Sequence, residues 1–134
     1  MQRLTRRLRR DERGASAVEF ALIVPLLVLL VVGIVEFGHA FQVQGELSAA
    51  AREGVRAMAL QNDPAAARAA VRNATSTFDP AVTDTQITIT PAACPVVGGS
   101  STVRLTVDYD MPFLTGLFGA GVDLSATGVM RCNG

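Results

Sequence analysis

One uninterrupted apolar run near the N-terminus limits how this chain can fold. Residues 15–35 read ASAVEFALIVPLLVLLVVGIV, with Glu19 as the only charged side chain. A helix of that length rises about 31 Å, which matches the hydrocarbon thickness of a bilayer. A buried core helix is the weaker reading, because a small soluble domain has no use for a helix that is apolar on every face. We therefore predict a membrane-spanning helix over residues 15–35.

Arginine residues crowd the stretch before the apolar run. Residues 1–13 contain six arginines against Asp11 and Glu12, although the formal net charge of the whole chain is zero. Positive flanks of a single span stay in the cytoplasm, so we expect the C-terminal part to lie outside it. A cleavable secretory signal, cut after Ala40, is the alternative. Its apolar region would be longer than usual and would contain a charge.

Glu19 needs an explanation, because a carboxylate is costly inside hydrocarbon. If the chain is cut after Gly14, Ala15 carries a new amine with a pKa near 8 and Glu19 becomes the fifth residue. Staggered copies of the helix can then pair Glu19 with the amine of a neighbour, which fixes their register. The alternative is a glutamate that reaches the cytoplasmic interface by itself. The spacing alone does not decide between the two.

The segment RGASAVEFALIVPLLVLLVVGIVEFGHAFQVQGELSAAAREGVR, residues 13–56, carries a family resemblance. It resembles the N-terminal region of TadE-like proteins, which are pilin-like minor components of the tight-adherence, or Flp-type, pilus system and relatives of type IV pilins. The matching features are Gly14 at the processing position, Glu19 at the fifth mature position, Phe20, Pro25, and a second acidic-aromatic pair, Glu36-Phe37, after Gly33.

The resemblance implies a structural role rather than catalysis. A prepilin peptidase would cut between Gly14 and Ala15 at the cytoplasmic face, and Glu19, Phe20 and Pro25 would serve assembly. The implied partners are the membrane, other pilin-like subunits and the pilus assembly platform. The implied location is the bacterial cytoplasmic membrane, with possible incorporation into a pilus. An unprocessed, single-pass anchor for an extracytoplasmic binding domain is the alternative, and it leaves Glu19 and Gly14 unexplained.

The helical pattern continues beyond the membrane segment as far as Gln61. Small and apolar residues recur at steps of three and four, as in a packing seam. We expect one face of this helix to contact its own domain and the other to contact neighbours. Asp63 and Pro64 are a good N-cap and first-turn residue, so a second helix is predicted from there to about Phe78. The seam consists of Ala40, Val43, Leu47, Ala50, Gly54 and Ala57, widened by Val55 and Met58.

Three segments alternate apolar and polar residues with the period of a strand: residues 85–90, 102–111 and 121–132. They predict a small three-stranded antiparallel sheet. The fold class is therefore α+β, with a long N-terminal helix that spans the membrane and extends outside it. We expect a leader over residues 1–14, the transmembrane and assembly helix over 15–61, and an extracytoplasmic domain over 62–134. The inward-facing positions are Ile87 and Ile89; Val103, Leu105, Val107 and Tyr109; and Val122, Leu124, Ala126, Met130 and Cys132.

Cys94 and Cys132 are the only cysteines, and both lie in the predicted exterior domain. Outside the cytoplasm we expect them to form a disulfide, with two free buried thiols as the alternative. Neither cysteine has a spacing typical of metal sites, and the chain has one histidine, so we expect no metal or other cofactor.

The remaining sequence offers no catalytic constellation, no phosphate-binding loop and no basic patch outside the leader. We therefore expect no enzymatic activity, no nucleic-acid partner and no small-molecule substrate. Asp108 and Asp110 share one strand face and are expected to be solvated rather than to bind a cation. Residues 112–121, PFLTGLFGAG, form an apolar loop that can cover the sheet, lie on the membrane or contact a partner.

Overall fold

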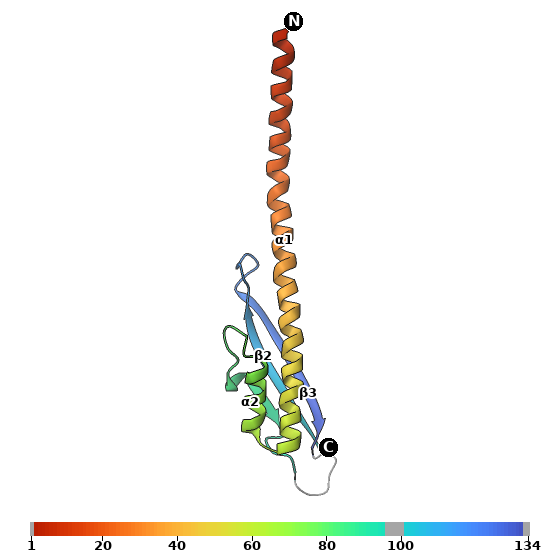
Figure 1. The fold of residues 1–134 in the computed structure, drawn as a ribbon, viewed down its shortest axis with the longest axis vertical. Helices are drawn as coiled ribbons and strands as arrows, with labels where there is room; N and C mark the ends of the chain where they lie inside the picture. Colours follow the sequence, from red (N-terminus) through yellow and green to blue (C-terminus); the bar gives the residue numbers. More distant parts are fainter. Residues whose placement is uncertain (1, 96–100, 133–134) are drawn as a thin grey trace. The chain divides into compact units, whose positions relative to one another are not determined.

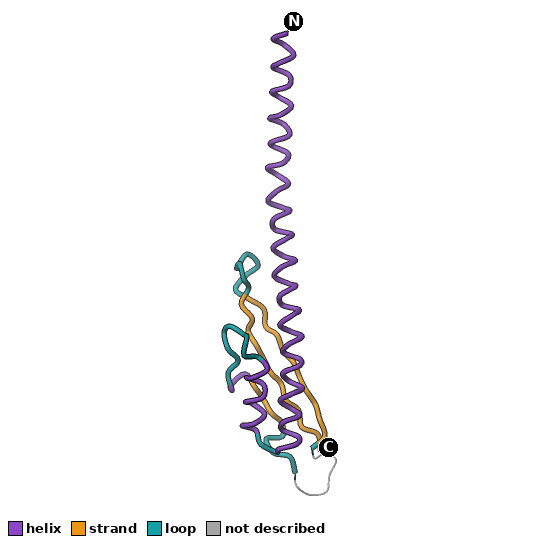
Figure 2. The backbone as a smooth tube through the Cα atoms, viewed as in Figure 1, coloured by secondary structure: helices purple, strands orange, loops and turns teal. Residues whose placement is uncertain are grey.

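A computed structural model describes residues 2–95 and 101–132, with side chains from residue 14 onward. It confirms the predicted α+β fold (Figures 1 and 2). The elements are α1 (Gln2–Gln61), α2 (Pro64–Ala74), the 3-10 turn η1 (Asp84–Gln86), β1 (Ile87–Thr90), β2 (Thr102–Pro112) and β3 (Gly121–Arg131). The chain divides into two compact units, Met1–Phe37 and Gly38–Gly134. Residues 96–100, part of the predicted link between β1 and β2, lie outside the described residues.

Helix α1 ends where the sequence predicts. It continues through Pro25 without interruption and stops at Gln61, followed by Asn62 in the left-handed region at φ 50°. The side chain of Asp63 accepts a hydrogen bond of 2.8 Å from the amide of Ala65, and Pro64 opens α2. The predicted cap is therefore confirmed, because a carboxylate satisfies one of the free amides at the start of a helix.

Helix α2 ends at Ala74, so the predicted end near Phe78 is wrong. The amide of Thr75 donates to the Val71 carbonyl, and the Thr75 hydroxyl donates to the same oxygen. A threonine hydroxyl competes in this way with continued helix formation. The segment that follows leaves the helix, and Phe78 packs against the ring of Tyr109 with centroids 5.0 Å apart.

The sheet is antiparallel with strand order β1-β2-β3. The alternation in β2 is confirmed, because its four predicted inward-facing side chains are all buried. In β3 the alternation is less sharp, and Met130 is 37% exposed although the pattern placed it inward. Strand β3 lies at the edge of the sheet, so its side chains have a neighbouring strand on one side only.

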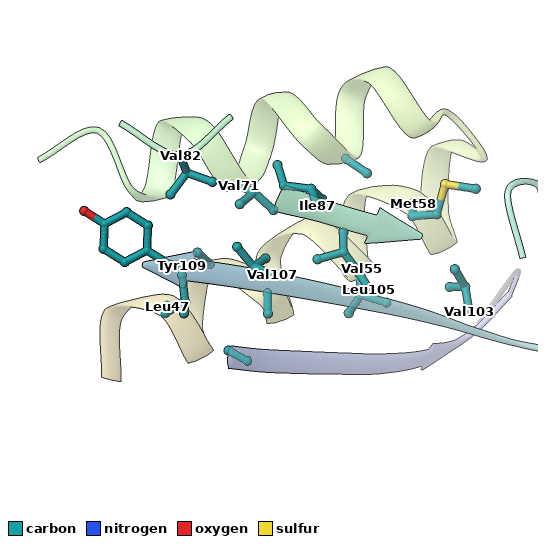
Figure 3. Packing of buried hydrophobic residues seen from close by; sticks show 14 of the residues in the cluster. Leu47, Val55, Met58, Val71, Val82, Ile87, Val103, Leu105, Val107 and Tyr109 are labelled. Carbon is teal, nitrogen blue, oxygen red and sulfur yellow. The ribbon is translucent and has the colours of Figure 1, made fainter. Parts of the chain in front are cut away.

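The core of the second unit lies between the sheet and the two helices (Figure 3). Residues 43–59 of α1 contribute the predicted seam, and Leu47 and Met58 are fully buried. Small residues let the backbones approach closely: a Cβ added at Gly128 of β3 would lie 2.6 Å from the carbonyl oxygen of Ala51. This half of α1 is therefore the central helix of its own domain, and the seam is used within the chain.

Candidate functional site

The first unit exposes an unusual amount of apolar surface. Among the described residues, Gly14–Gln61 is the one helical segment that is long and apolar enough to cross a membrane. None of its most apolar stretch is buried within the chain. This N-terminal helix fits a single-pass membrane anchor. Within residues 15–35, the large apolar side chains that are at least half exposed are Val18, Phe20, Leu22, Ile23, Leu26, Leu27, Val28, Leu29, Leu30, Val31, Ile34 and Val35.

Glu19 lies on this exposed apolar surface. Four helical residues separate it from Ala15, an axial rise of about 6 Å, or one turn. Ser16, Ala17 and Val18 between them are all exposed, so the carboxylate is open to the surroundings of the helix. In a single chain Glu19 is thus available to a partner outside the chain.

The other predicted processing and assembly residues lie on the same helix. Gly14 has open space around it, since a Cβ added there would meet no atom within 4 Å. The Phe20 side chain is 70% exposed. Pro25 has no amide hydrogen, so it cannot donate to the Ala21 carbonyl one turn earlier. These residues share an exposed helix but form no enclosed pocket.

Glu36 differs from Glu19, although both are followed by phenylalanine. Its side chain is fully buried and takes part in an interaction within the chain. Glu36 is therefore not a solvent-exposed carboxylate, although it directly follows the apolar run. Buried carboxylates are retained where the fold supplies partners for them, which makes Glu36 a structural residue of the single chain.

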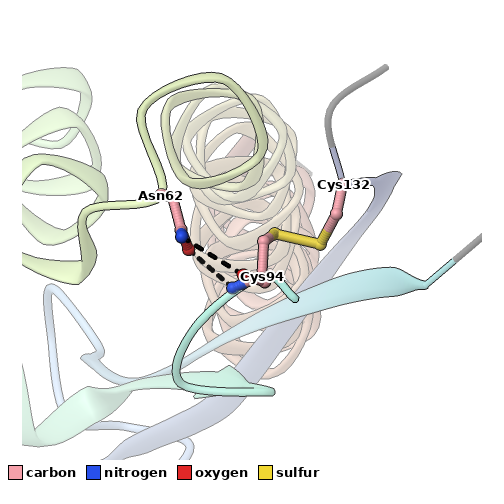
Figure 4. The surroundings of a disulfide bond; sticks show 3 residues. All are labelled: Asn62, Cys94 and Cys132. Carbon is pink, nitrogen blue, oxygen red and sulfur yellow. Dashed lines mark hydrogen bonds between the residues drawn. A yellow bond between two sulfur atoms is a disulfide. The ribbon is translucent and has the colours of Figure 1, made fainter. Parts of the chain in front are cut away.

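Cys94 and Cys132 form the predicted disulfide, with Cα atoms 5.6 Å apart (Figure 4). Asn62, which directly follows α1, makes two hydrogen bonds to the backbone of Cys94. Its side-chain amide donates to the Cys94 carbonyl at 3.2 Å, and its side-chain oxygen accepts from the Cys94 amide at 2.6 Å. Sequence reasoning missed this clamp. The available signal was an asparagine directly after a helix, since asparagine tolerates the left-handed conformation there.

The two aspartates singled out on β2 lie on the outer face of the sheet and are exposed. Asp108 accepts a hydrogen bond of 2.7 Å from the hydroxyl of Ser125. Asp110 is directly opposite Asp123, a like-charge pair that disfavours strand pairing at that point. The described residues hold no group of three or more His, Cys, Asp or Glu side chains suited to a metal ion.

A cavity of about 430 Å³ lies at one end of the second unit, beside the turn between β2 and β3. His39 and Glu46 line it from α1, and Tyr109 and Phe113 line it from β2 and the turn. The Tyr109 hydroxyl donates to the Pro80 carbonyl at 2.9 Å. Burial raises the pKa of this phenol above its ordinary value, and the Asp79 carboxylate raises the pKa further. The tyrosine is therefore a neutral structural donor and not a base.

The exposed apolar half of α1, with Glu19 one turn from Ala15, lies within a segment that matches a known protein family. The family model described as TadE-like protein matches residues 14–56. Residues 14–56 are therefore similar to TadE-like proteins. No curated protein and no solved structure matches the chain.

The TadE-like segment begins at Gly14 and ends at Arg56, so it covers about a third of the chain. It contains both the exposed apolar part of α1 and most of the part that packs in the second unit. The match suggests a pilus-related, pilin-like role, and the matched family is structural rather than catalytic. The sheet, α2 and the disulfide lie outside the matched residues.

Proposed function

We propose that this protein is a minor pilin or pseudopilin, a structural subunit in the assembly of a tight-adherence pilus or a related secretion apparatus. The supporting observation is the exposed apolar surface of residues 15–35, within the TadE-like segment, with Glu19 on it. That surface finds no cover in the described part of its own chain. Lipid covers it before assembly, and the helices of other pilin-like subunits cover it afterwards.

Maturation precedes assembly. A prepilin peptidase removes residues 1–14 at the cytoplasmic face of the bacterial cytoplasmic membrane, where the arginine-rich leader is retained. Helix α1 is continuous across this point, so cleavage requires local unwinding. Gly14 lowers the cost of unwinding by about 1 kcal/mol relative to alanine, and it adds no side chain to be accommodated in the peptidase cleft.

The cut creates the second half of an ion pair. The amine of Ala15 is largely cationic at neutral pH. Within one helix the amine and Glu19 are about 6 Å apart along the axis, so a neighbour displaced by one turn brings its amine level with this carboxylate. Pairing offsets the cost of enclosing Glu19 among apolar helices, and it does so at one stagger only. Glu19 thus sets the register between this subunit and its neighbours on the assembly platform.

The N-terminal residue of the protein from its native host tests this proposal. We expect Ala15 as the first residue, found by Edman degradation or intact mass. The Gly14→Arg variant should remain uncut, because a long cation replaces the residue that has no side chain. Gly14→Ala is the matched control and should be cut at least in part. An intact Met1, or a new end at Phe41, in the native protein contradicts the proposed maturation.

A further inference from the structure

Among the described residues of the second unit outside α1, the turn between β2 and β3 carries the most exposed apolar side chains. Leu114 and Leu117 are 62% and 63% exposed, and Phe118 is 39% exposed. No charged residue occurs from Pro112 to Gly121. Soluble surfaces seldom gather large apolar side chains in one uncharged turn, so this turn marks a contact site.

The backbone presents the turn away from the core instead of folding it back over the sheet. The amide of Phe113 donates to the Ala120 carbonyl at 3.1 Å and closes the hairpin. Gly116 and Gly119 then adopt φ values of 68° and 115°, which other residues rarely adopt. The turn is visible as the teal segment that joins the two long strands in Figure 2.

Chain connectivity indicates whether this turn lies near lipid or in bulk water. Phe113 and Leu114 line the same cavity as His39. His39 follows the last residue of the apolar run, Val35, by four positions, and even a fully extended link of that length reaches only about 14 Å. If residues 15–35 span the bilayer, chain connectivity therefore keeps His39, on the cavity wall, within about 14 Å of the end of the span.

The opposite end of the sheet lies far from the turn. The register places the turn at the Pro112–Gly121 end, whereas the disulfide adjoins the Thr102–Arg131 end. Eleven strand residues separate these ends by roughly 35 Å. Of the two ends of the sheet, the apolar turn is therefore the one that lies on the side of the chain tether.

We propose that the β2–β3 turn, Phe113–Ala120, inserts into the interface of the same bilayer that residues 15–35 span, in the leaflet next to the second unit. Its ligand is the boundary between headgroups and acyl chains. The turn has no cation to bind acidic headgroups, and Asp110 and Asp123 face each other at its base. Insertion is therefore apolar, is insensitive to salt, and stops at these carboxylates. The proposal rests on the membrane anchor but not on pilus assembly.

The chain contains no tryptophan, so single substitutions provide unique fluorophores. Leu117→Trp reports on the turn and Leu114→Trp is a second position in it. Ala93→Trp, exposed beside the disulfide, is the control for the distant end. Leu27→Trp reports on the anchor itself. Each full-length variant is placed in phosphatidylcholine nanodiscs at one copy per disc, with bromine on the acyl chains as quencher.

We expect quenching and a shift of emission to shorter wavelength for Leu117→Trp and Leu114→Trp, at low and high salt alike. Ala93→Trp should show neither change and should be quenched by aqueous iodide. Leu27→Trp should be quenched most. Emission of both turn variants that matches Ala93→Trp overturns the proposal, and so does shielding that appears only with two copies per disc. If Leu27→Trp is also unquenched, the anchor has failed as well, and the proposed function falls with the inference.

Discussion

The two halves of α1 belong to one continuous helix and meet opposite environments. Between Val18 and Val35 most large side chains are at least half exposed, whereas Leu47, Ala50 and Met58 are completely buried. The first half is apolar on every face, and the second is apolar along one seam of mostly small residues. Uniform apolarity indicates a helix whose cover comes from outside the chain. A seam with a polar opposite face indicates a helix that is covered by its own domain.

The largest expected effect is on the free energy of unfolding of Gly38–Gly134, and it distinguishes a substitution in the second half of α1 from one in the first half. Leu47→Asp should prevent this unit from folding, because truncating a buried leucine already costs about 2–5 kcal/mol and the variant adds an unpaired buried carboxylate. Leu27→Asp is the matched change in the first half. It should leave the unfolding transition in detergent unchanged and impair membrane insertion instead. Circular dichroism melts and a membrane-extraction assay give the two readouts.

Equal loss of stability in the two leucine variants would contradict the comparison. It would show that the first half of α1 contributes to the folding of the second unit. Its apolar side chains would then be covered in solution by the chain's own second unit.

The disulfide gives the next largest effect, and it acts on the second unit alone. Cys94 and Cys132 are 38 positions apart, so the bond restricts a long loop of the unfolded chain. Replacing both with serine should lower the free energy of unfolding by roughly 3–4 kcal/mol. A reductant should destabilise the natural chain to a similar extent and leave the double variant unaffected. Full labelling of both thiols in the denatured native protein without reductant would contradict the bond itself.

Much of this fold is predictable from the sequence, because local signals and tertiary packing agree. The span, the helix end at Gln61, the cap at Asp63 and the inward face of β2 follow from periodicity and capping alone. The disulfide follows from the expectation that the domain with the two cysteines lies outside the cytoplasm. The TadE-like segment is recognisable because its glycine, glutamate and proline have fixed offsets.

The misses share a physical cause, which is tertiary contact that no local pattern encodes. Glu36 is fully buried although it directly follows the apolar run, and no local pattern announces that burial. Helix α2 stops early because Thr75 finds the Val71 carbonyl. The clamp of Asn62 on Cys94 spans 32 positions. The cavity beside Tyr109 likewise joins three separate segments, so neither feature has a signature within a short window.

Two glycines of α1 sharpen the comparison on a finer scale. A Cβ at Gly54 would lie 2.5 Å from a Val71 methyl and 2.8 Å from a Leu105 methyl, whereas Gly45 has open space. Gly54→Ala should destabilise the second unit, because overpacking costs about 1–3 kcal/mol and offsets the gain in helix propensity. Gly45→Ala should stabilise it by up to about 1 kcal/mol. Urea unfolding measures both, and equal signs for the two variants would mean that α1 does not pack on the sheet at Gly54.

Substitution of Glu19 should have the smallest effect on the stability of the folded chain but should abolish assembly. Its side chain is exposed and lies in the first unit, so Glu19→Val should leave the unfolding of the second unit, the disulfide, membrane insertion and cleavage unchanged. The variant should fail to co-purify with the pilus machinery, because staggered helices lose the partner of the new amine. Glu19→Gln separates charge from hydrogen bonding and should also fail if the ion pair fixes the register.

The control for Glu19 must be a carboxylate that the chain does not use. Glu36 is unsuitable, since its burial means that Glu36→Ala acts on the fold and confounds any loss of assembly. Glu53 is exposed on the same helix, beyond the membrane segment, and Glu53→Ala should leave both stability and assembly close to normal. Normal piliation with Glu19→Val would show that this carboxylate does not set the register between neighbouring helices. The apolar surface alone would then have to align the subunits, and a uniformly apolar helix has no feature that favours one stagger over the next.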